Sequence, residues 1–154
     1  MRPGALSGRR LTASRGLVAE LRLEWFEAPW SHGDGATRGY RVVDERGGAW
    51  SDADLDDSGV HVLRVAGASH RADALQADGF APGEPVILMP ESDNPHDPFA
   101  LAVLDLSLAW QAGYVPATRS RELVEEMRHR ALHALVLAEH RAGGRRVGLR
   151  VAGT

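Results

Sequence analysis

A loop between two apolar runs gathers side chains suited to binding chemistry. The runs Val86–Met89 and Ala100–Leu104 have the length and composition of strands. Between them stand an amide, an imidazole and a carboxylate, Asn94, His96 and Asp97, among three prolines. Proline fixes φ at its own position and pushes the preceding residue toward extended conformations, so this loop should be stiff. A stiff loop loses less entropy on binding, which favours a role in recognition.

The rest of the chain reads as short strands that position this loop. Alternating or continuous apolar runs predict strands over residues 17–26, 40–43, 60–66, 85–89, 100–106, 109–115, 132–139 and 147–152. A helix is expected over residues 70–78, with Gly79 ending it in a Schellman motif. A second helix should start at a cap, Thr118 or Ser120, and run to about Arg130, with Leu123, Val124 and Met127 buried. This pattern predicts a mainly β fold: a small, partly open β-barrel of the OB or SH3 kind with two short helices.

Three segments follow from composition. Residues 1–16 are rich in Arg, Gly and Ser and are expected to form a disordered basic tail. Residues 17–58 should form an N-terminal β-hairpin extension followed by an acidic linker, and residues 59–152 the barrel. Trp25, Trp30 and Trp50 fall in the extension, where we expect a small satellite core more than an aromatic binding face.

Composition narrows the function classes. The chain has 154 residues, 44% hydrophobic and 25% charged, which suits a soluble globular protein. It has no cysteine, which excludes disulfides and thiolate metal sites. No apolar run approaches the roughly 20 residues of a membrane span and no signal peptide is evident, so a cytoplasmic location is expected. The chain contains no lysine, hence no P-loop, and no nucleophile elbow.

The central loop and its surroundings resemble the signature of the HIRAN domain, which occurs at the front of fork-remodelling helicases and as small bacterial proteins. The family pattern is Asn-Pro-(Tyr or His)-Asp-x-x-Ala, an apolar strand, and Gly-Tyr-(Leu or Val)-Pro. It is matched here by Asn94-Pro95-His96-Asp97, Ala100 and Gly113-Tyr114-Val115-Pro116. The resemblance covers roughly residues 60 to 130, with an extension to 152, and implies a barrel.

The resemblance implies a binding site for the free 3′ end of single-stranded DNA, in repair or replication. The family's carboxylate, which accepts a hydrogen bond from the 3′-hydroxyl, falls at Asp97. A carboxylate accepts hydrogen bonds and repels a terminal phosphate, so one group can separate the two kinds of end. The motif amide and the rings that stack on bases fall at Asn94, His96, Tyr114 and His70. Phosphates would need cations, for which Arg64, Arg71, Arg119 and Arg121 are candidates. Phe99 and Ser69 depart from the pattern, at positions where a polar residue and an Arg are often found.

Two other functions remain open. A metal-dependent hydrolase of nucleic acid would use Asp93, His96 and Asp97, with His61 or His70, as ligands for a divalent cation. A protein-interaction module would display the hairpin of residues 17–50. We favour a binding module over an enzyme. No cofactor is required for binding, and an ATPase or helicase on another chain is a plausible partner.

Overall fold

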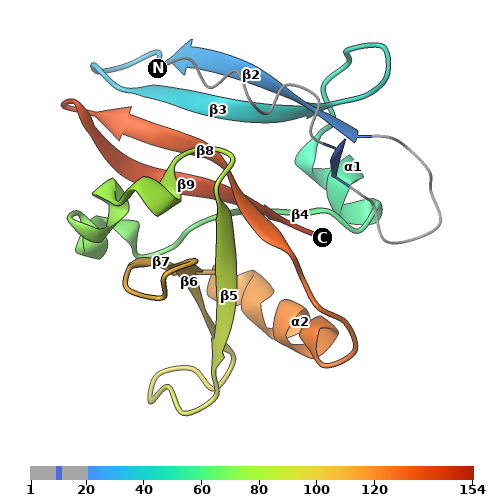
Figure 1. Cartoon of the computed structure of the whole chain (residues 1–154), viewed down its shortest axis with the longest axis vertical. Helices are drawn as coiled ribbons and strands as arrows, with labels where there is room; N and C mark the ends of the chain where they lie inside the picture. Colours follow the sequence, from blue (N-terminus) through green and yellow to red (C-terminus); the bar gives the residue numbers. More distant parts are fainter. Residues whose placement is uncertain (1–9, 12–20) are drawn as a thin grey trace.

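The computed structural model describes residues 10–11 and 21–154. The expected disordered tail, residues 1–16, lies outside this range except for Arg10–Leu11, which form strand β1. The remaining strands are β2 (Leu21–Pro29), β3 (Ala36–Val43), β4 (His61–Arg64), β5 (Pro85–Glu91), β6 (Ala100–Asp105), β7 (Gln111–Tyr114), β8 (Ala134–Ala142) and β9 (Arg145–Gly153). All strand pairs are antiparallel (Figure 1). The expected mainly β architecture is therefore confirmed.

Six strands form the partly open barrel that the sequence predicts. β5, β6 and β7 make a meander, and the start of β8 pairs with β5 through Leu135 and Ala134. β8 then pairs along its length with β9, which in turn pairs with β4. The loop between β5 and β6 lies at one end of this barrel, on the same side as helix α2 (Ala117–Met127) (Figure 1).

The barrel seam between β4 and β7 is held at a single point. Ala66 donates a backbone hydrogen bond to Tyr114 at 2.7 Å and accepts one from it at 2.9 Å. Gly113 permits this approach, because a Cβ atom there would lie 2.3 Å from the carbonyl oxygen of Ala66, and its φ is +147°. A side chain at this position would push the two strands apart. The glycine of the Gly-Tyr-Val-Pro motif thus permits the bridge between the two edges of the partly open barrel.

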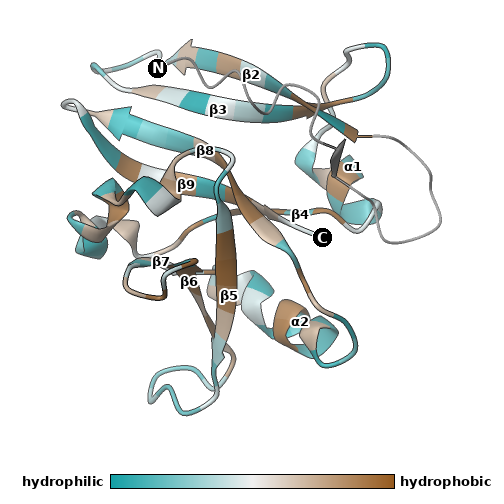
Figure 2. Cartoon of the chain, viewed as in Figure 1, coloured by the Kyte–Doolittle hydropathy of each residue, from teal (hydrophilic) through white to brown (hydrophobic). Residues whose placement is uncertain are grey.

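Apolar side chains fill the barrel in one contiguous core. It is built from residues of every barrel strand, and Figure 2 shows the hydrophobic stretch of β5 above a hydrophilic loop. Leu123 on α2 is fully buried in this core, with Val124 and Met127 packed against it, so the predicted stripe of this helix is confirmed. Burying these side chains stabilises the fold by roughly 25 cal/mol for each Å² of apolar surface removed from water.

The β2–β3 hairpin continues the sheet beyond the barrel. β3 pairs with β8 between Ala36↔Arg141 and Gly39↔Ala138. A second core, formed by residues of both the hairpin and the barrel, lies here; it comprises Leu21, Leu23, Tyr40, Val42, Leu55, Val60, Val62, Leu135, Leu137 and Ala152. The assignment of separate segments at residue 58 stays a prediction, but the hairpin and the barrel share this core.

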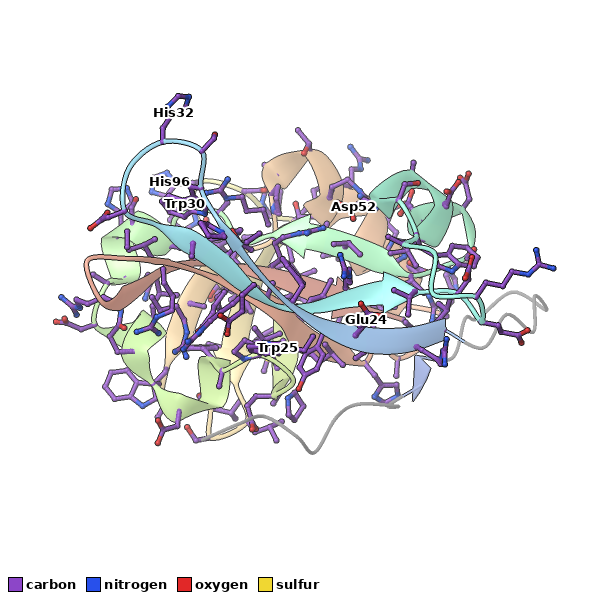
Figure 3. The ribbon with its side chains drawn as sticks, turned by 90° about the horizontal axis from the view of Figure 1, so that it is seen from above. Glu24, Trp25, Trp30, His32, Asp52 and His96 are labelled. Atoms are coloured by element: carbon purple, nitrogen blue, oxygen red, sulfur yellow. The ribbon has the colours of Figure 1, made fainter. Side chains whose placement is uncertain are left out.

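The tryptophans of the hairpin divide between core and surface. Trp25 and Trp50 pack against the second core, and the Trp25 ring meets Tyr40 edge-on at 5.2 Å between centroids. The satellite-core expectation holds for both. It is wrong for Trp30, which is 38% exposed and donates its indole hydrogen to Thr37 Oγ1 at 3.0 Å. Figure 3 shows His32 pointing outward from the neighbouring turn.

The helices differ from expectation in two respects. Residues 70–78 do not form one helix but span three 3₁₀ turns, η1 (Ala68–Arg71), η2 (Ala74–Gln76) and η3 (Asp78–Phe80), so the Schellman ending at Gly79 is wrong. α2 starts after Pro116 with no side-chain cap, so neither Thr118 nor Ser120 serves as one. The acidic run 51–58, expected to be a linker or a helical turn, contains the short helix α1 (Asp52–Asp57), capped by the side chain of Ser51.

Within the described residues, none of the helices is both long enough and apolar enough to cross a membrane.

Candidate nucleic-acid interface

Asn94 organises the loop between β5 and β6. Its side-chain oxygen accepts hydrogen bonds from the backbone amides of His96, at 2.9 Å, and Asp97, at 3.2 Å. This is the local turn chemistry that short amide side chains perform, and it explains why an amide stands before the proline. The Asn94 amide group also donates to Glu91 Oε1 at 3.1 Å, which ties the loop to the end of β5.

Asp97 presents one free carboxylate oxygen. Oδ1 accepts a hydrogen bond from the backbone amide of Phe99 at 2.8 Å. Among the residues that the structure describes, none forms a hydrogen bond or ion pair with Oδ2 of Asp97. The side chain is partly exposed, and the neighbouring His96 is exposed. The carboxylate is therefore neither sealed in the barrel nor used up by its own backbone.

Tyr114 joins this loop through Glu91. The Tyr114 hydroxyl donates to Glu91 Oε1 at 3.0 Å, the same atom that binds the Asn94 amide. The two motifs of the sequence pattern, separated by about twenty residues, thus meet at one carboxylate. Glu91 was missed by sequence reasoning, because an acidic residue that ends a strand carries no signal of its own.

His70 and Arg71 lie on the next element along. They are the last two residues of η1, which packs beside β7, the strand that carries Tyr114. His70 is exposed and Arg71 partly exposed, and neither side chain has a polar partner in the described part of the chain. Both therefore lie on an element that packs beside the strand of Tyr114, and both are available to a ligand.

Phe99 and Arg121 form a second feature of the loop. The guanidinium carbon of Arg121, on α2, lies 4.7 Å from the centroid of the Phe99 ring. Stacking of this kind is a cation–π contact, worth about 0.5–1 kcal/mol at an exposed site. The sequence offered Arg121 only as one of several cations and treated Phe99 as a departure, so their pairing was not foreseen.

The structure does not bring Arg119 and Arg64 to the loop. Arg119 binds Asp56 Oδ1 at 2.7 Å, pairs with Glu122 and lies 3.2 Å from His61 Nδ1. Arg64 is exposed on β4. Burial of His140 lowers the pKa of that imidazole, and the positive charges of Arg64 and Arg150 lower it further. Arg119 is therefore engaged elsewhere, and Arg64 lies on β4 opposite Arg150 of β9.

The ligands of the alternative metal site are not gathered either. In the part of the chain that the structure describes, the group of potential ligands that lie close together is Asp56, His61 and Glu122, with ligand atoms within 4.8 Å of one another. Asp93, His96 and Asp97 form no such group. Of the histidines considered for that site, His61 belongs to the Asp56 group, and His70 does not.

The guanidinium of Arg119 already binds two carboxylates of the Asp56 group. The Asp56 group lines a cavity of about 580 Å³ together with other carboxylates. His61 lies 2.8 Å from Asp56 and 2.7 Å from Glu126. The guanidinium of Arg119 contacts Asp56 and Glu122, the two carboxylates that a metal ion would bind. Burial raises the pKa of Asp56, but hydrogen bonds with His61 and Arg119 outweigh it and leave that pKa below its usual value. We interpret this cluster as an ion-pair network that joins α1 to α2.

Comparison with known proteins gives one match. The family model of the HIRAN domain matches residues 58–153, which is most of the chain and contains every element of the loop and its neighbours. No curated protein and no solved structure matches the chain.

Proposed function

The chain belongs to the HIRAN domain family, and on that basis we propose that it captures the free 3′-OH end of single-stranded DNA. HIRAN domains are nucleic-acid-binding modules, and membership of the family makes this chain such a module. The 3′-end specificity, and a role in DNA repair or replication, are our proposal.

The observation that carries the proposal is the free oxygen of Asp97. With Oδ1 bound to Phe99 and Oδ2 open, the carboxylate can accept one further hydrogen bond. A terminal sugar hydroxyl supplies that donor. A 3′-phosphate supplies negative charge instead, and a continuous strand supplies no hydroxyl at this position of the sugar. The loop is braced before binding by Asn94, so little ordering entropy is lost.

The surrounding side chains suit the remaining parts of a DNA end. His96, Tyr114 and His70 offer rings on which bases stack, at about 1–3 kcal/mol for each base and without sequence preference. Arg71 lies on the same side as His70 and is available for phosphate, since no polar group of the described residues binds it. Arg119 is left out of the proposal because its guanidinium is held by Asp56 and Glu122. Arg64 would contribute to phosphate binding only if the bound DNA strand extended across β4.

The experiment is a binding panel with one labelled single-stranded oligonucleotide in three forms: a 3′-OH end, a 3′-phosphate end, and a circular form without ends. We expect the 3′-OH form to bind more tightly than either of the others, by tenfold or more, which corresponds to about 1.4 kcal/mol. Equal affinity for all three forms, or no binding at low salt, would contradict the proposal. An RNA oligonucleotide of the same sequence then separates DNA from RNA.

A helicase or ATPase on another chain remains the partner that we propose for this module. A metal-dependent hydrolase has less support, because Asp93, His96 and Asp97 are not grouped as ligands. Nuclease activity that appears with Mg²⁺ and disappears in Asp97→Ala would restore it. We likewise retain a cytoplasmic location as a prediction.

A further inference from the structure

Arg121 lies next to the proposed binding carboxylate through a short chain of contacts. The Phe99 backbone amide binds Asp97 Oδ1 at 2.8 Å, and the Phe99 ring carries the Arg121 guanidinium at 4.7 Å. Asp97 and Phe99 are only two positions apart. A strand whose terminal sugar meets Asp97 therefore has its last internucleotide linkages within reach of Arg121.

Arg121 and Arg119 have opposite surroundings although they share one helix. Residues two apart on a helix of about 3.6 residues per turn project about 200° apart. Arg119 accordingly faces α1, where Asp56 and Glu122 bind it, and Arg121 faces the loop. The Arg121 side chain is 71% exposed, and its carboxylate neighbour, Glu125, stands at 3.7 Å, too far for a strong hydrogen bond. Arg121 is thus a cation held in position yet free to bind an anion.

We propose that Arg121, held flat on the Phe99 ring, binds a backbone phosphate in one of the last two linkages of the captured strand. The inference rests on the proposed function and adds the group that fixes the direction of the strand. A carboxylate alone repels the phosphates behind the terminal sugar, and a guanidinium beside it offsets that repulsion. Its planar fork matches two phosphate oxygens at once.

Phe99 acts as the positioning residue in this arrangement. An unsupported arginine samples many rotamers and loses this side-chain freedom when it is fixed. A ring beneath the guanidinium restricts that freedom before the ligand arrives, so less is lost on binding. This gives a physical role to an aromatic residue at a position where the family pattern often has a polar one.

The test measures how the affinity of a 3′-OH oligonucleotide depends on salt. One phosphate contact contributes about 0.7 to the slope of log K against log salt concentration for a single strand. We expect Arg121→Gln to weaken binding and to lower this slope by about that amount. Arg128→Gln is the matched control, because it removes the same charge from the end of the same helix, where the side chain is exposed. Phe99→Leu should weaken binding several-fold with little change in slope.

A neutral linkage locates the contact. Each of the last two phosphates is replaced in turn by a methylphosphonate. One of the two replacements should weaken binding to the unaltered protein, and the same replacement should not weaken binding to Arg121→Gln, because the contact is already lost there. An unchanged slope in Arg121→Gln, or equal effects of the methylphosphonates on both proteins, would overturn the inference. If Arg121 passes both tests while 3′-OH and 3′-phosphate ends bind equally, the end-recognition proposal fails and the phosphate contact stands. If the unaltered protein binds no oligonucleotide, both fail.

Discussion

The Tyr114 hydroxyl and the Asn94 amide donate hydrogen bonds to the same carboxylate oxygen of Glu91, at 3.0 and 3.1 Å. Tyr114 ends β7 and Asn94 stands in the loop after β5, so Glu91 fixes the position of that loop against the barrel. The loop that we propose to bind DNA ends is therefore held in a fixed position at one end of the barrel.

Asp97→Asn should abolish discrimination between strand ends. The amide keeps an acceptor oxygen for the Phe99 backbone but loses the negative charge that repels a 3′-phosphate. We expect the preference for 3′-OH over 3′-phosphate to fall toward unity, measured by fluorescence anisotropy with the two oligonucleotides. Asp93→Asn is the control, since Asp93 is exposed on the same loop and should leave the preference unchanged. A preference retained in Asp97→Asn would show that another group reads the end.

Tyr114→Phe should loosen the loop while keeping the ring. The variant removes one hydrogen bond to Glu91 and is expected to cost about 1 kcal/mol. The backbone amides of His96, Asp97 and Phe99, which are hydrogen-bonded within the loop, should then exchange with solvent faster. Glu91→Gln retains an acceptor oxygen and should have a smaller effect. Unchanged exchange rates at these three amides in Tyr114→Phe would argue against Glu91 as the anchor of the loop.

Glu139 is the buried charge on which the junction of hairpin and barrel depends. It is 1% exposed and binds Arg38, on β3, and Arg146, on β9, each at 2.6 Å. Arg146 is itself 8% exposed. Glu139→Gln leaves that arginine without its counter-charge, and we expect a loss of about 3–5 kcal/mol in the free energy of unfolding, measured with urea. Glu24→Gln, which breaks an exposed pair with Arg41, should cost less than about 1 kcal/mol.

The same carboxylate should make stability fall in acid. Burial raises the pKa of Glu139, but hydrogen bonds from Arg38 and Arg146 outweigh it and leave that pKa below its usual value. A group whose folded pKa is lowered contributes stability above its unfolded pKa, about 4.3 for glutamate, and loses it as the pH falls through the folded value. Unfolding free energies should therefore decrease below about pH 4–5. The decrease should be smaller in Glu139→Gln, and an identical pH profile would contradict this assignment.

Gly113→Ala should open the barrel seam. The added Cβ would lie 2.3 Å from the Ala66 carbonyl oxygen, in a backbone conformation that L residues rarely adopt. Both effects destabilise, and we expect a loss of more than about 2 kcal/mol, seen as a lower melting temperature. Gly47→Ala provides the comparison, because Gly47 has a φ of +82° but open space around it. Similar losses in both variants would mean that backbone strain alone, without the close approach, sets the cost.

The strands and the loop could be predicted because their signals are local. Apolar runs bounded by proline and glycine gave β5 to β7, and the spacing of Leu123, Val124 and Met127 gave the buried face of α2. The 3₁₀ segment could not, because its backbone is bound by a distant side chain. Arg146 donates to the carbonyl oxygens of Leu75 and Ala77, groups that a continuous helix would use for its own hydrogen bonds.

The cations of the candidate site show a different limit. Helix periodicity separates Arg119 from Arg121, but it does not say which of the two faces the loop and which faces α1. That depends on how α2 docks, and hence on its packing against β6. In the same way, Glu91 gains its role only when β7 pairs with β6 and the Tyr114 hydroxyl reaches the end of β5. Residues that act through tertiary neighbours, such as Glu91, were therefore missed, whereas the motif residues could be proposed from the sequence alone.

Gly39 brings the hairpin into close contact with β8. A Cβ atom at this position would lie 2.4 Å from the Leu137 carbonyl oxygen, so the backbones of β3 and β8 pack here without room for a side chain. A relative that lost the hairpin would leave Leu135 and Leu137 facing water and the edge of β8 unpaired, an invitation to aggregate. We therefore expect relatives without this hairpin to carry polar side chains at those two positions, or to shield the edge with another segment.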